Sequence, residues 1–131
     1  MSAQKIIVDT SVWIEYFKNN KQYVPILDDN LNLENIIICG IIISELLQGV
    51  KGSKEHDMLS SAIGAIPYIE CMFDDWVKTG KILHDLKKNG ISIPLTDVLI
   101  ATIAIRNNAS VLTLDKHFRE ISFVADLDLY P

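Results

Sequence analysis

The chain has 131 residues, of which 49% are hydrophobic, with a mean hydropathy of +0.22 and a formal net charge of −5 at pH 7. This length predicts one domain with its own hydrophobic core, and this composition excludes the disordered and low-complexity classes. The longest apolar run, 36–43, is far shorter than the roughly 20 residues that cross a bilayer, and no signal peptide is evident, so we expect a cytoplasmic protein without a membrane segment.

The first half of the chain alternates short β-branched runs with segments of helical periodicity. Thr10 and Ser11 are expected to cap the first helix, and Ser53 the fourth. The elements predicted in chain order are a strand at 5–8, helices at 12–18 and 24–29, a strand at 36–39, helices at 41–48 and 53–63, and a strand at 68–71.

The second half continues the alternation with two longer helices. One is predicted at 73–88, and the next starts at Pro94 and Thr96 and ends at Asn107. This second helix is apolar on all sides, which is typical of a central helix. A strand at 110–113, a turn or short helix at 116–121 and an edge strand at either 123–124 or 127–129 complete the chain.

Strands that alternate with helices predict an α/β fold with right-handed crossovers. Because the strands are uniformly apolar, both faces of the sheet should be covered. We therefore expect a single domain over residues 1–131, with a central parallel sheet of four to five short strands and helices on both faces.

Four carboxylates occupy positions where a solvated surface group is not expected. Asp9 and Asp115 each end an apolar strand, at the edge where open α/β folds place their ligands. Glu45 shares a helix face with isoleucines, and Asp97 shares one with the apolar residues of the central helix. A charge on an apolar face is costly unless it is paired or bound to a metal. Oxygen ligands suit Mg²⁺ and Mn²⁺, so the four acids predict a shared site for one of these ions.

Each of these acids also has an ordinary explanation when it is taken alone. Asp9 could cap a helix, Glu45 could be a surface residue, Asp97 could interact with a helix dipole and Asp115 could belong to a turn. Their common placement near the carboxyl ends of strands favours the shared site.

The sequence around each acid resembles a motif of the PIN-domain family, in particular of the VapC toxins of bacterial and archaeal toxin–antitoxin pairs. The resembling segments are Ile7-Val8-Asp9-Thr10-Ser11-Val12-Trp13-Ile14, Ile43-Ser44-Glu45-Leu46-Leu47-Gln48-Gly49, Thr96-Asp97-Val98-Leu99-Ile100-Ala101 and Leu112-Thr113-Leu114-Asp115-Lys116-His117-Phe118. They occur in the family's order and lie within residues 5–118, nearly the whole chain.

The resemblance implies a PIN domain and a metal-dependent endoribonuclease, the toxin of a type II toxin–antitoxin pair. It implies that Asp9, Glu45, Asp97 and Asp115 hold Mg²⁺ or Mn²⁺ and act in catalysis, giving products with a 5′-phosphate and a 3′-hydroxyl. It also implies that supporting hydroxyls occur at Ser11 and Thr113, and that the partners are an antitoxin and a second copy of the chain.

One position departs from the family pattern. Many relatives carry a further acid two residues after the last aspartate, where this chain has His117. The departure leaves open whether a second metal ion binds, and we expect His117 to be a surface histidine rather than a ligand.

The negative net charge argues against a nucleic-acid binder, which normally carries a basic patch. Setting four metal ligands aside from the 17 acidic residues leaves 13 against 12 Lys and Arg, so the rest of the chain is nearly neutral. Contacts to RNA, expected at single-stranded loops of a structured molecule, are assigned to four basic residues near the motifs. These are Lys51, Lys54, Lys116 and Arg119.

Trp13, Tyr16 and Phe17 are interpreted as occupying three faces of a short helix, so that not all of them can lie in the core. Exposed apolar side chains suggest a partner, and in VapC-like proteins this region helps receive the antitoxin. Trp76 and its helix are one candidate surface for a homodimer.

Three other interpretations are considered. A receiver-like phosphoacceptor module needs paired acids after the first strand, but Thr10 follows Asp9. A haloacid-dehalogenase-type phosphatase needs a second aspartate where Ser11 stands. A PIN-like scaffold that binds without catalysis would not need all four acids.

Overall fold

Five short parallel strands form the centre of the computed structural model, which describes residues 4–131; Met1–Ala3 of the expected domain lie outside this range. Their order in the sheet is β3-β2-β1-β4-β5, and all neighbouring pairs are parallel. The register pairs Ile7 with Ile37 on one side and with Val111 on the other. The strands are β1 (Ile6–Val8), β2 (Ile36–Cys39), β3 (Tyr68–Ile69), β4 (Ser110–Leu112) and β5 (Asp128–Leu129).

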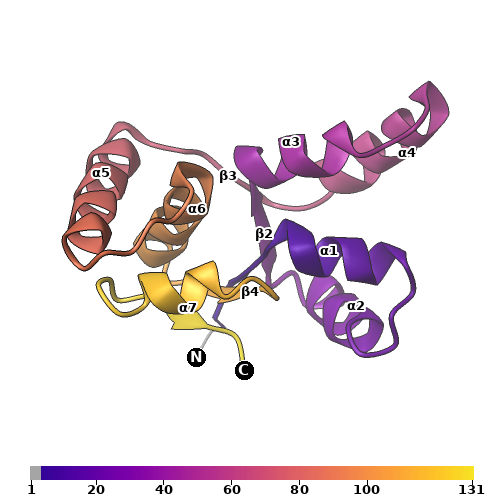
Figure 1. Ribbon diagram of the computed structural model, residues 1–131. Coiled ribbons are helices and arrows are strands. Elements are labelled where there is room, and N and C mark those ends of the chain that lie inside the picture. Colours follow the sequence, from indigo (N-terminus) through magenta and orange to yellow (C-terminus); the bar gives the residue numbers. More distant parts are fainter. Residues whose placement is uncertain (1–3) are drawn as a thin grey trace.

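Helices cover both faces of this sheet, as the apolar strands predict. In Figure 1, α5, α6 and α7 lie on one side of the strands, and α1 to α4 lie on the other. The helices are α1 (Thr10–Phe17), α2 (Val24–Asn32), α3 (Gly40–Gln48), α4 (Ser53–Gly64), α5 (Phe73–Lys88), α6 (Leu95–Arg106) and α7 (His117–Ile121). The predicted α/β class, with a parallel sheet of four to five strands, is therefore confirmed.

Several boundaries and caps differ from the prediction. The helix expected to end at residue 29 continues to Asn32, and the strand expected at 68–71 ends at Ile69. Of the two alternatives for the edge strand, the one at 127–129 is correct. The caps expected at Thr10, Ser11 and Ser53 are wrong, because α1 and α4 start at Thr10 and Ser53 and the capping positions are Asp9 and Gly52. The side chain of Asp9 does not cap its helix, since it is hydrogen-bonded elsewhere.

The central helix α6 is buried over seven consecutive residues, Val98–Ala104. The side chain of Thr102, inside this run, donates to the carbonyl of Val98 and accepts a hydrogen bond of 2.9 Å from Thr79 of α5. Both hydroxyls are thus paired away from water, as buried polar groups must be. The packing of α5 against α6 fixes the position of the first turn of α6, which carries Asp97.

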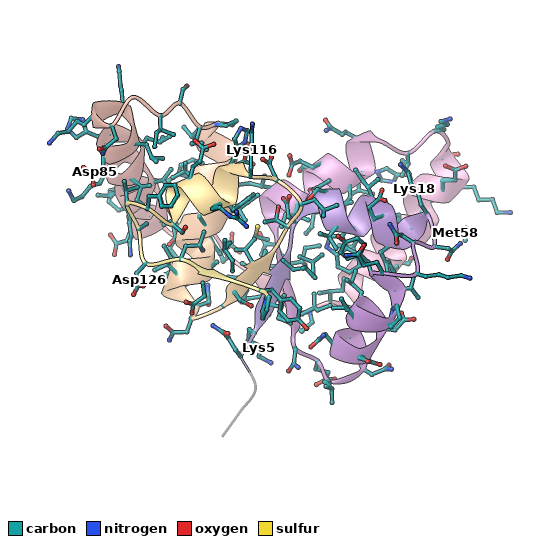
Figure 2. All side chains as sticks on the ribbon, turned by 60° about the horizontal axis from the view of Figure 1, so that its bottom comes forward. Lys5, Lys18, Met58, Asp85, Lys116 and Asp126 are labelled. Carbon is teal, nitrogen blue, oxygen red and sulfur yellow. The ribbon has the colours of Figure 1, made fainter. Side chains whose placement is uncertain are left out.

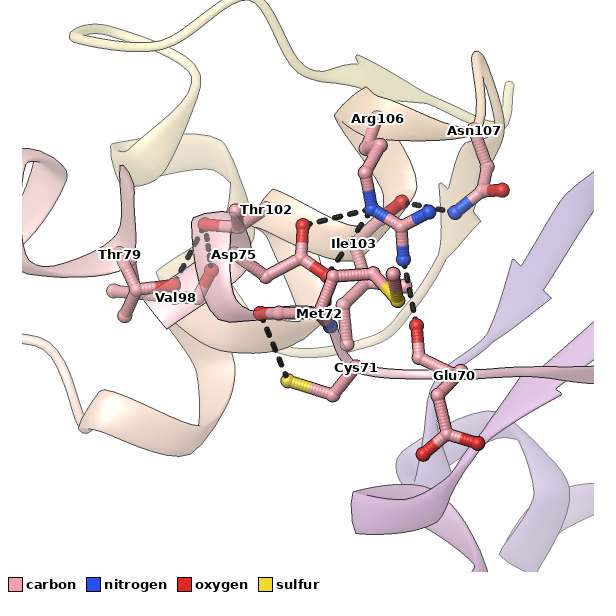
Figure 3. Close-up of polar contacts among 10 residues, drawn as sticks. All are labelled: Glu70, Cys71, Met72, Asp75, Thr79, Val98, Thr102, Ile103, Arg106 and Asn107. Atoms are coloured by element: carbon pink, nitrogen blue, oxygen red, sulfur yellow. Dashed lines mark hydrogen bonds and ion pairs between the residues drawn. The ribbon is translucent and has the colours of Figure 1, made fainter. Parts of the chain in front are cut away.

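An ion pair joins the far end of α6 to the start of α5 (Figure 3). Nε of Arg106 lies 2.8 Å from Oδ1 and 3.1 Å from Oδ2 of Asp75, whose side chain is only 2% exposed. The same guanidinium donates to the carbonyl oxygen of Glu70, and the backbone N–H of Met72 donates to Asp75. Local sequence patterns do not reveal this pair, because 31 residues separate its partners.

Among residues 4–131, no helix combines the length and the apolar character that a membrane span requires.

Candidate metal centre

The four predicted acids lie at the carboxyl edge of the sheet or on the helices that leave it. Asp9 follows β1, and Asp115 follows the neighbouring strand β4 after two intervening residues. Glu45 lies on α3, which starts directly after β2, and Asp97 lies in the first turn of α6. Because β2, β1 and β4 are adjacent and parallel, their carboxyl ends meet at one edge.

Asp9 is 6% exposed and is held by two hydroxyl groups. Ser11 Oγ donates to its Oδ2 over 2.8 Å, and Thr113 Oγ1 donates to the same oxygen over 2.9 Å. The backbone N–H of Leu114 in turn donates to Ser11 Oγ, and that of Asp115 donates to Thr113 Oγ1. Ser11 and Thr113 therefore hold the Asp9 carboxylate and tie the end of β1 to the turn after β4.

Among residues 4–131, Asp97, Asp115 and His117 form the tightest group of side chains whose spacing could hold a metal ion, being the one group of three His, Cys, Asp or Glu side chains with a ligand atom from each within 4.8 Å of the others. Nδ1 of His117 lies 2.9 Å from Oδ2 of Asp97 and 3.2 Å from Oδ1 of Asp115. Burial raises the pKa of Asp97, the hydrogen bond with His117 opposes this, and the charges of Asp115 and Asp9 raise it further.

The expectation that His117 is a surface histidine is wrong. Its side chain is 31% exposed and is hydrogen-bonded to Asp97. That hydrogen bond raises the pKa of the imidazole, and the charges of Asp115 and Asp97 add to the effect.

Glu45 approaches the same group of acids from α3. Thr10 Oγ1 donates to Glu45 Oε1 over 3.0 Å, a role for Thr10 that the sequence analysis missed. Burial raises the pKa of Glu45; the hydrogen bond from Thr10 lowers it, and the nearby charges of Asp9 and Asp97 raise it. These mutual effects mean that all four acids share one electrostatic environment, although Asp9 and Glu45 lie outside the tightest group.

Each of the four carboxylates has one oxygen engaged by the chain and the other without a hydrogen bond among residues 4–131. The engaged oxygens are Oδ2 of Asp9, Oε1 of Glu45, Oδ2 of Asp97 and Oδ1 of Asp115. The four remaining oxygens are hard, anionic donors of the kind that suits Mg²⁺ or Mn²⁺. The donor chemistry of this site therefore fits a divalent cation.

The raised pKa of Glu45 leads to a prediction about stability. A carboxyl whose native pKa is raised destabilises the fold when it is ionised, and this destabilisation disappears as the pH falls through the raised value. We expect Glu45→Gln to raise the midpoint of thermal unfolding by about 2–5 °C at pH 7.5 in EDTA. The exposed Glu70→Gln serves as the matched control and should leave the midpoint unchanged; an equal midpoint for both variants would contradict the crowding of the acids.

The four basic residues assigned to RNA contacts are all exposed, and none forms a salt bridge within the described part of the chain. Lys116 and Arg119 lie on either side of His117 near the candidate metal centre, Lys51 lies in the turn between α3 and α4, and Lys54 lies at the start of α4. Figure 2 shows Lys116, the residue before α7, well apart from Lys18 and Met58 on the α1 and α4 side.

Trp13, Tyr16 and Phe17 share one face of α1, so the interpretation that placed them on three faces is wrong. Residues three and four apart in a helix are neighbours on its surface. The three rings pack pairwise with centroids 5.6–5.8 Å apart. Trp13 belongs to the core at 3% exposure, whereas Phe17 is 48% exposed. The hydroxyl of Tyr16 donates to Asp28 of α2, which raises the pKa of Tyr16 to about 12.

Two apolar grooves adjoin this aromatic face. One, of about 520 Å³, runs between α1 and α4 and includes all three aromatic residues together with Leu59 and Ile63. The other, of about 840 Å³, is lined by Phe17, Lys18, Met58 and Glu45 among others. One of the four acids therefore lies on the wall of an apolar groove.

Comparisons with known proteins agree with this geometry. The family model for the PIN domain matches residues 6–124. Ribonuclease VapC1 of Methanocaldococcus jannaschii is 33% identical over 120 residues, covering 89% of this chain and 81% of that protein. Ribonuclease VapC11 of Mycobacterium tuberculosis is 27% identical over 129 residues, covering 93% and 95%. The structure of VapBC2 from Rickettsia felis, bound to a promoter DNA fragment, superimposes with a TM-score of 0.80 at 22% identity, covering 97% of this chain and 98% of that one.

Proposed function

The chain belongs to the PIN-domain family, and from that premise we propose that it is a metal-dependent endoribonuclease, the toxin component of a type II toxin–antitoxin pair. The observation that supports this most strongly is the set of four acids from separate elements, each with one oxygen left for a ligand. The relatives named as VapC ribonucleases support the choice of RNA. An RNA substrate in turn supports action in the cytoplasm.

Each acid has a role in the proposed hydrolysis. When bound, Mg²⁺ or Mn²⁺ lowers the pKa of a coordinated water, orients the scissile phosphate and stabilises negative charge on its oxygens. Asp9 and Asp97 hold the ion, Glu45 holds it or orients a water, and Asp115 completes the site. Ser11 and Thr113 keep Asp9 oriented, since both hydroxyls point at its Oδ2. No serine or cysteine nucleophile takes part.

RNA contacts are proposed for Lys116 and Arg119 beside the centre, for Lys51 in the turn after α3 and for Lys54 at the start of α4. Their exposure, and the lack of salt bridges to them among residues 4–131, support this assignment. A few local cations can position a phosphate backbone although the chain as a whole is acidic. Contacts to phosphate do not distinguish one RNA sequence from another. Single-stranded loops are the proposed targets, because their bases are accessible, unlike those of an A-form duplex.

The function is tested with a pool of tRNA and rRNA incubated with purified, antitoxin-free protein and Mg²⁺ or Mn²⁺. We expect cleavage at defined positions, its loss in EDTA and its return when the ion is restored. If the folded protein binds RNA but does not cut it under any of these conditions, the nuclease proposal is overturned in favour of the non-catalytic scaffold. The receiver-like and phosphatase alternatives are set aside by membership of the PIN family.

The antitoxin is proposed to bind over α1 and α4, in the groove of about 520 Å³ that Trp13, Tyr16 and Phe17 help to line. Exposed aromatic rings beside an apolar groove are typical anchors of protein interfaces. Several solved structures to which this chain is similar are VapBC complexes, which supports an antitoxin as its partner.

We expect Phe17→Asp to weaken antitoxin binding at least about tenfold, because a charge replaces an apolar anchor. Calorimetry with the purified product of the neighbouring open reading frame measures the affinity. The control is Phe123→Asp, the same change at a residue that is 71% exposed and outside both grooves. Equal affinities of the two variants for the antitoxin would show that the antitoxin does not bind at Phe17 of α1.

A homodimer is also proposed, through the outward face of α5. Phe73, Trp76 and Val77 are 80%, 53% and 59% exposed and follow the spacing of one helix face. An apolar stripe of this kind on the surface is typical of a protein contact. Sedimentation equilibrium of the chain without its antitoxin decides between a monomer and a dimer.

A further inference from the structure

The position of His117 relative to two of the acids has a consequence for the choice of metal. Its Nδ1 lies 2.9 Å from Asp97 and 3.2 Å from Asp115, and the three ligand atoms are all within 4.8 Å of one another. Asp97 and Asp115 both belong to the proposed metal site. A nitrogen atom is therefore already present among the carboxylate oxygens of that site.

The fold holds this imidazole in place rather than leaving it free on the surface. His117 is the first residue of α7, and its backbone N–H donates to Oδ1 of Asp115 over 2.9 Å. The next residue, Phe118, is fully buried and anchors the helix in the core. The backbone N–H of Asp115 is itself held by Thr113, which also binds Asp9. The network that orients the acids thus also orients His117.

We propose that Nδ1 of His117 gives up its proton and its hydrogen bond to Asp97 when an ion binds and becomes a direct ligand, and that this nitrogen makes the site prefer Mn²⁺ to Mg²⁺. The proposal rests on the proposed metal-dependent function and concerns this chain's own departure from an all-acid donor set. Mg²⁺ strongly prefers oxygen ligands in near-ideal octahedral geometry, whereas the first-row transition metals accept imidazole nitrogen. Mn²⁺ is the weakest binder of that series, so the nitrogen favours Mn²⁺ only relative to Mg²⁺. Replacing a carboxylate with imidazole also removes one negative charge, which weakens the attraction for the harder ion.

The test uses ion binding rather than cleavage. Mn²⁺ is titrated into the metal-free full chain, free Mn²⁺ is followed by electron paramagnetic resonance, and Mg²⁺ is added as a competitor. In the wild type we expect tighter binding of Mn²⁺ and a pulsed-resonance signal from a directly coordinated ¹⁴N. In His117→Asp the ¹⁴N signal should vanish, and the ratio of the Mg²⁺ to the Mn²⁺ dissociation constant should fall at least about tenfold.

Two further variants separate a ligand from a residue that only orients Asp97. His117→Asn can still donate a hydrogen bond to Asp97 but offers no imidazole nitrogen, so we expect it to lose the ¹⁴N signal as well. His84→Asp makes the same substitution at an exposed histidine of α5 and should keep both the signal and the selectivity. Near-ultraviolet circular dichroism establishes that each variant is folded.

The outcomes distinguish this inference from the proposed function. Metal-dependent RNA cleavage together with bound Mn²⁺ that lacks a ¹⁴N signal would overturn the role of His117 and leave the nuclease standing. A selectivity ratio unchanged in His117→Asp would do the same. Absence of both divalent-ion binding and cleavage in the folded chain would overturn both proposals.

Discussion

Asp97→Asn is expected to lower the rate of RNA cleavage by about three orders of magnitude or more, because it removes a charged ligand of the proposed ion. An amide has nearly the same shape as the carboxylate and can still bond to His117, so the fold should remain intact. Initial rates on a defined RNA in Mg²⁺ or Mn²⁺ measure the loss, and circular dichroism checks the fold.

The loss of RNA cleavage in Asp97→Asn should not be accompanied by a loss of folding stability. Because the native pKa of Asp97 is raised, its ionised form destabilises the metal-free protein, and the amide variant should be at least as stable as the wild type. The matched control is Asp126→Asn, the same change at an exposed aspartate (Figure 2), which should keep full activity. Unchanged cleavage by Asp97→Asn would remove this acid from the site.

The second large effect is expected at the ion pair of Figure 3, in which Asp75 is buried and Arg106 is 36% exposed. Arg106→Met keeps the aliphatic part of the side chain but leaves the carboxylate of Asp75, which is 2% exposed, without its cation. Removing one partner of a fully buried pair costs about 3–5 kcal/mol, and because water screens the exposed guanidinium we expect about 2–3 kcal/mol here, against the ~5–15 kcal/mol by which domains are stable. Urea unfolding at pH 7 measures the difference. Lys18→Met, which breaks the exposed pair with Glu15, should cost less than about 1 kcal/mol.

The pH dependence of this loss follows from the pKa of Asp75. Burial opposes its ionisation, but the hydrogen bonds from Arg106 and from the Met72 N–H outweigh burial and hold the pKa below its usual range. A lowered native pKa means that the stabilisation is present above the unfolded value of about 3.9 and is lost as the pH falls through the native value. The gap between wild type and Arg106→Met should therefore narrow below about pH 4; a gap that is constant with pH would assign the loss to packing.

Most of the fold could be predicted because its signals are local. The apolar runs that form β1, β2 and β4, and the helix α6 that is apolar on every side, report burial directly through their composition. The caps could not be predicted in the same way. The side chain of Asp9 leaves its capping position because Thr113, 104 residues away, donates to it.

In the candidate metal centre, too, the features with local sequence signals could be predicted and those that depend on distant residues could not. The four acids could be selected because each lies in a distinctive local motif. The place of His117 depends on Asp97, 20 residues earlier, and that of Thr10 on Glu45, 35 residues later. Trp13, Tyr16 and Phe17 are a different case. Their spacing of three and four residues places them on one face of a helix, so their arrangement could have been predicted from the sequence.

The hydrogen bonds that hold one oxygen of each acid bear on how an ion is captured. A flexible carboxylate loses rotational freedom when it coordinates, and that loss weakens binding. Here Ser11, Thr113, Thr10 and the backbone N–H of His117 have already restricted Asp9, Glu45 and Asp115 before any ion arrives. The conformational entropy of these ligand side chains is therefore lost when the chain folds and not when the ion binds. In this respect the chain resembles a rigid macrocyclic chelator more than an open-chain one.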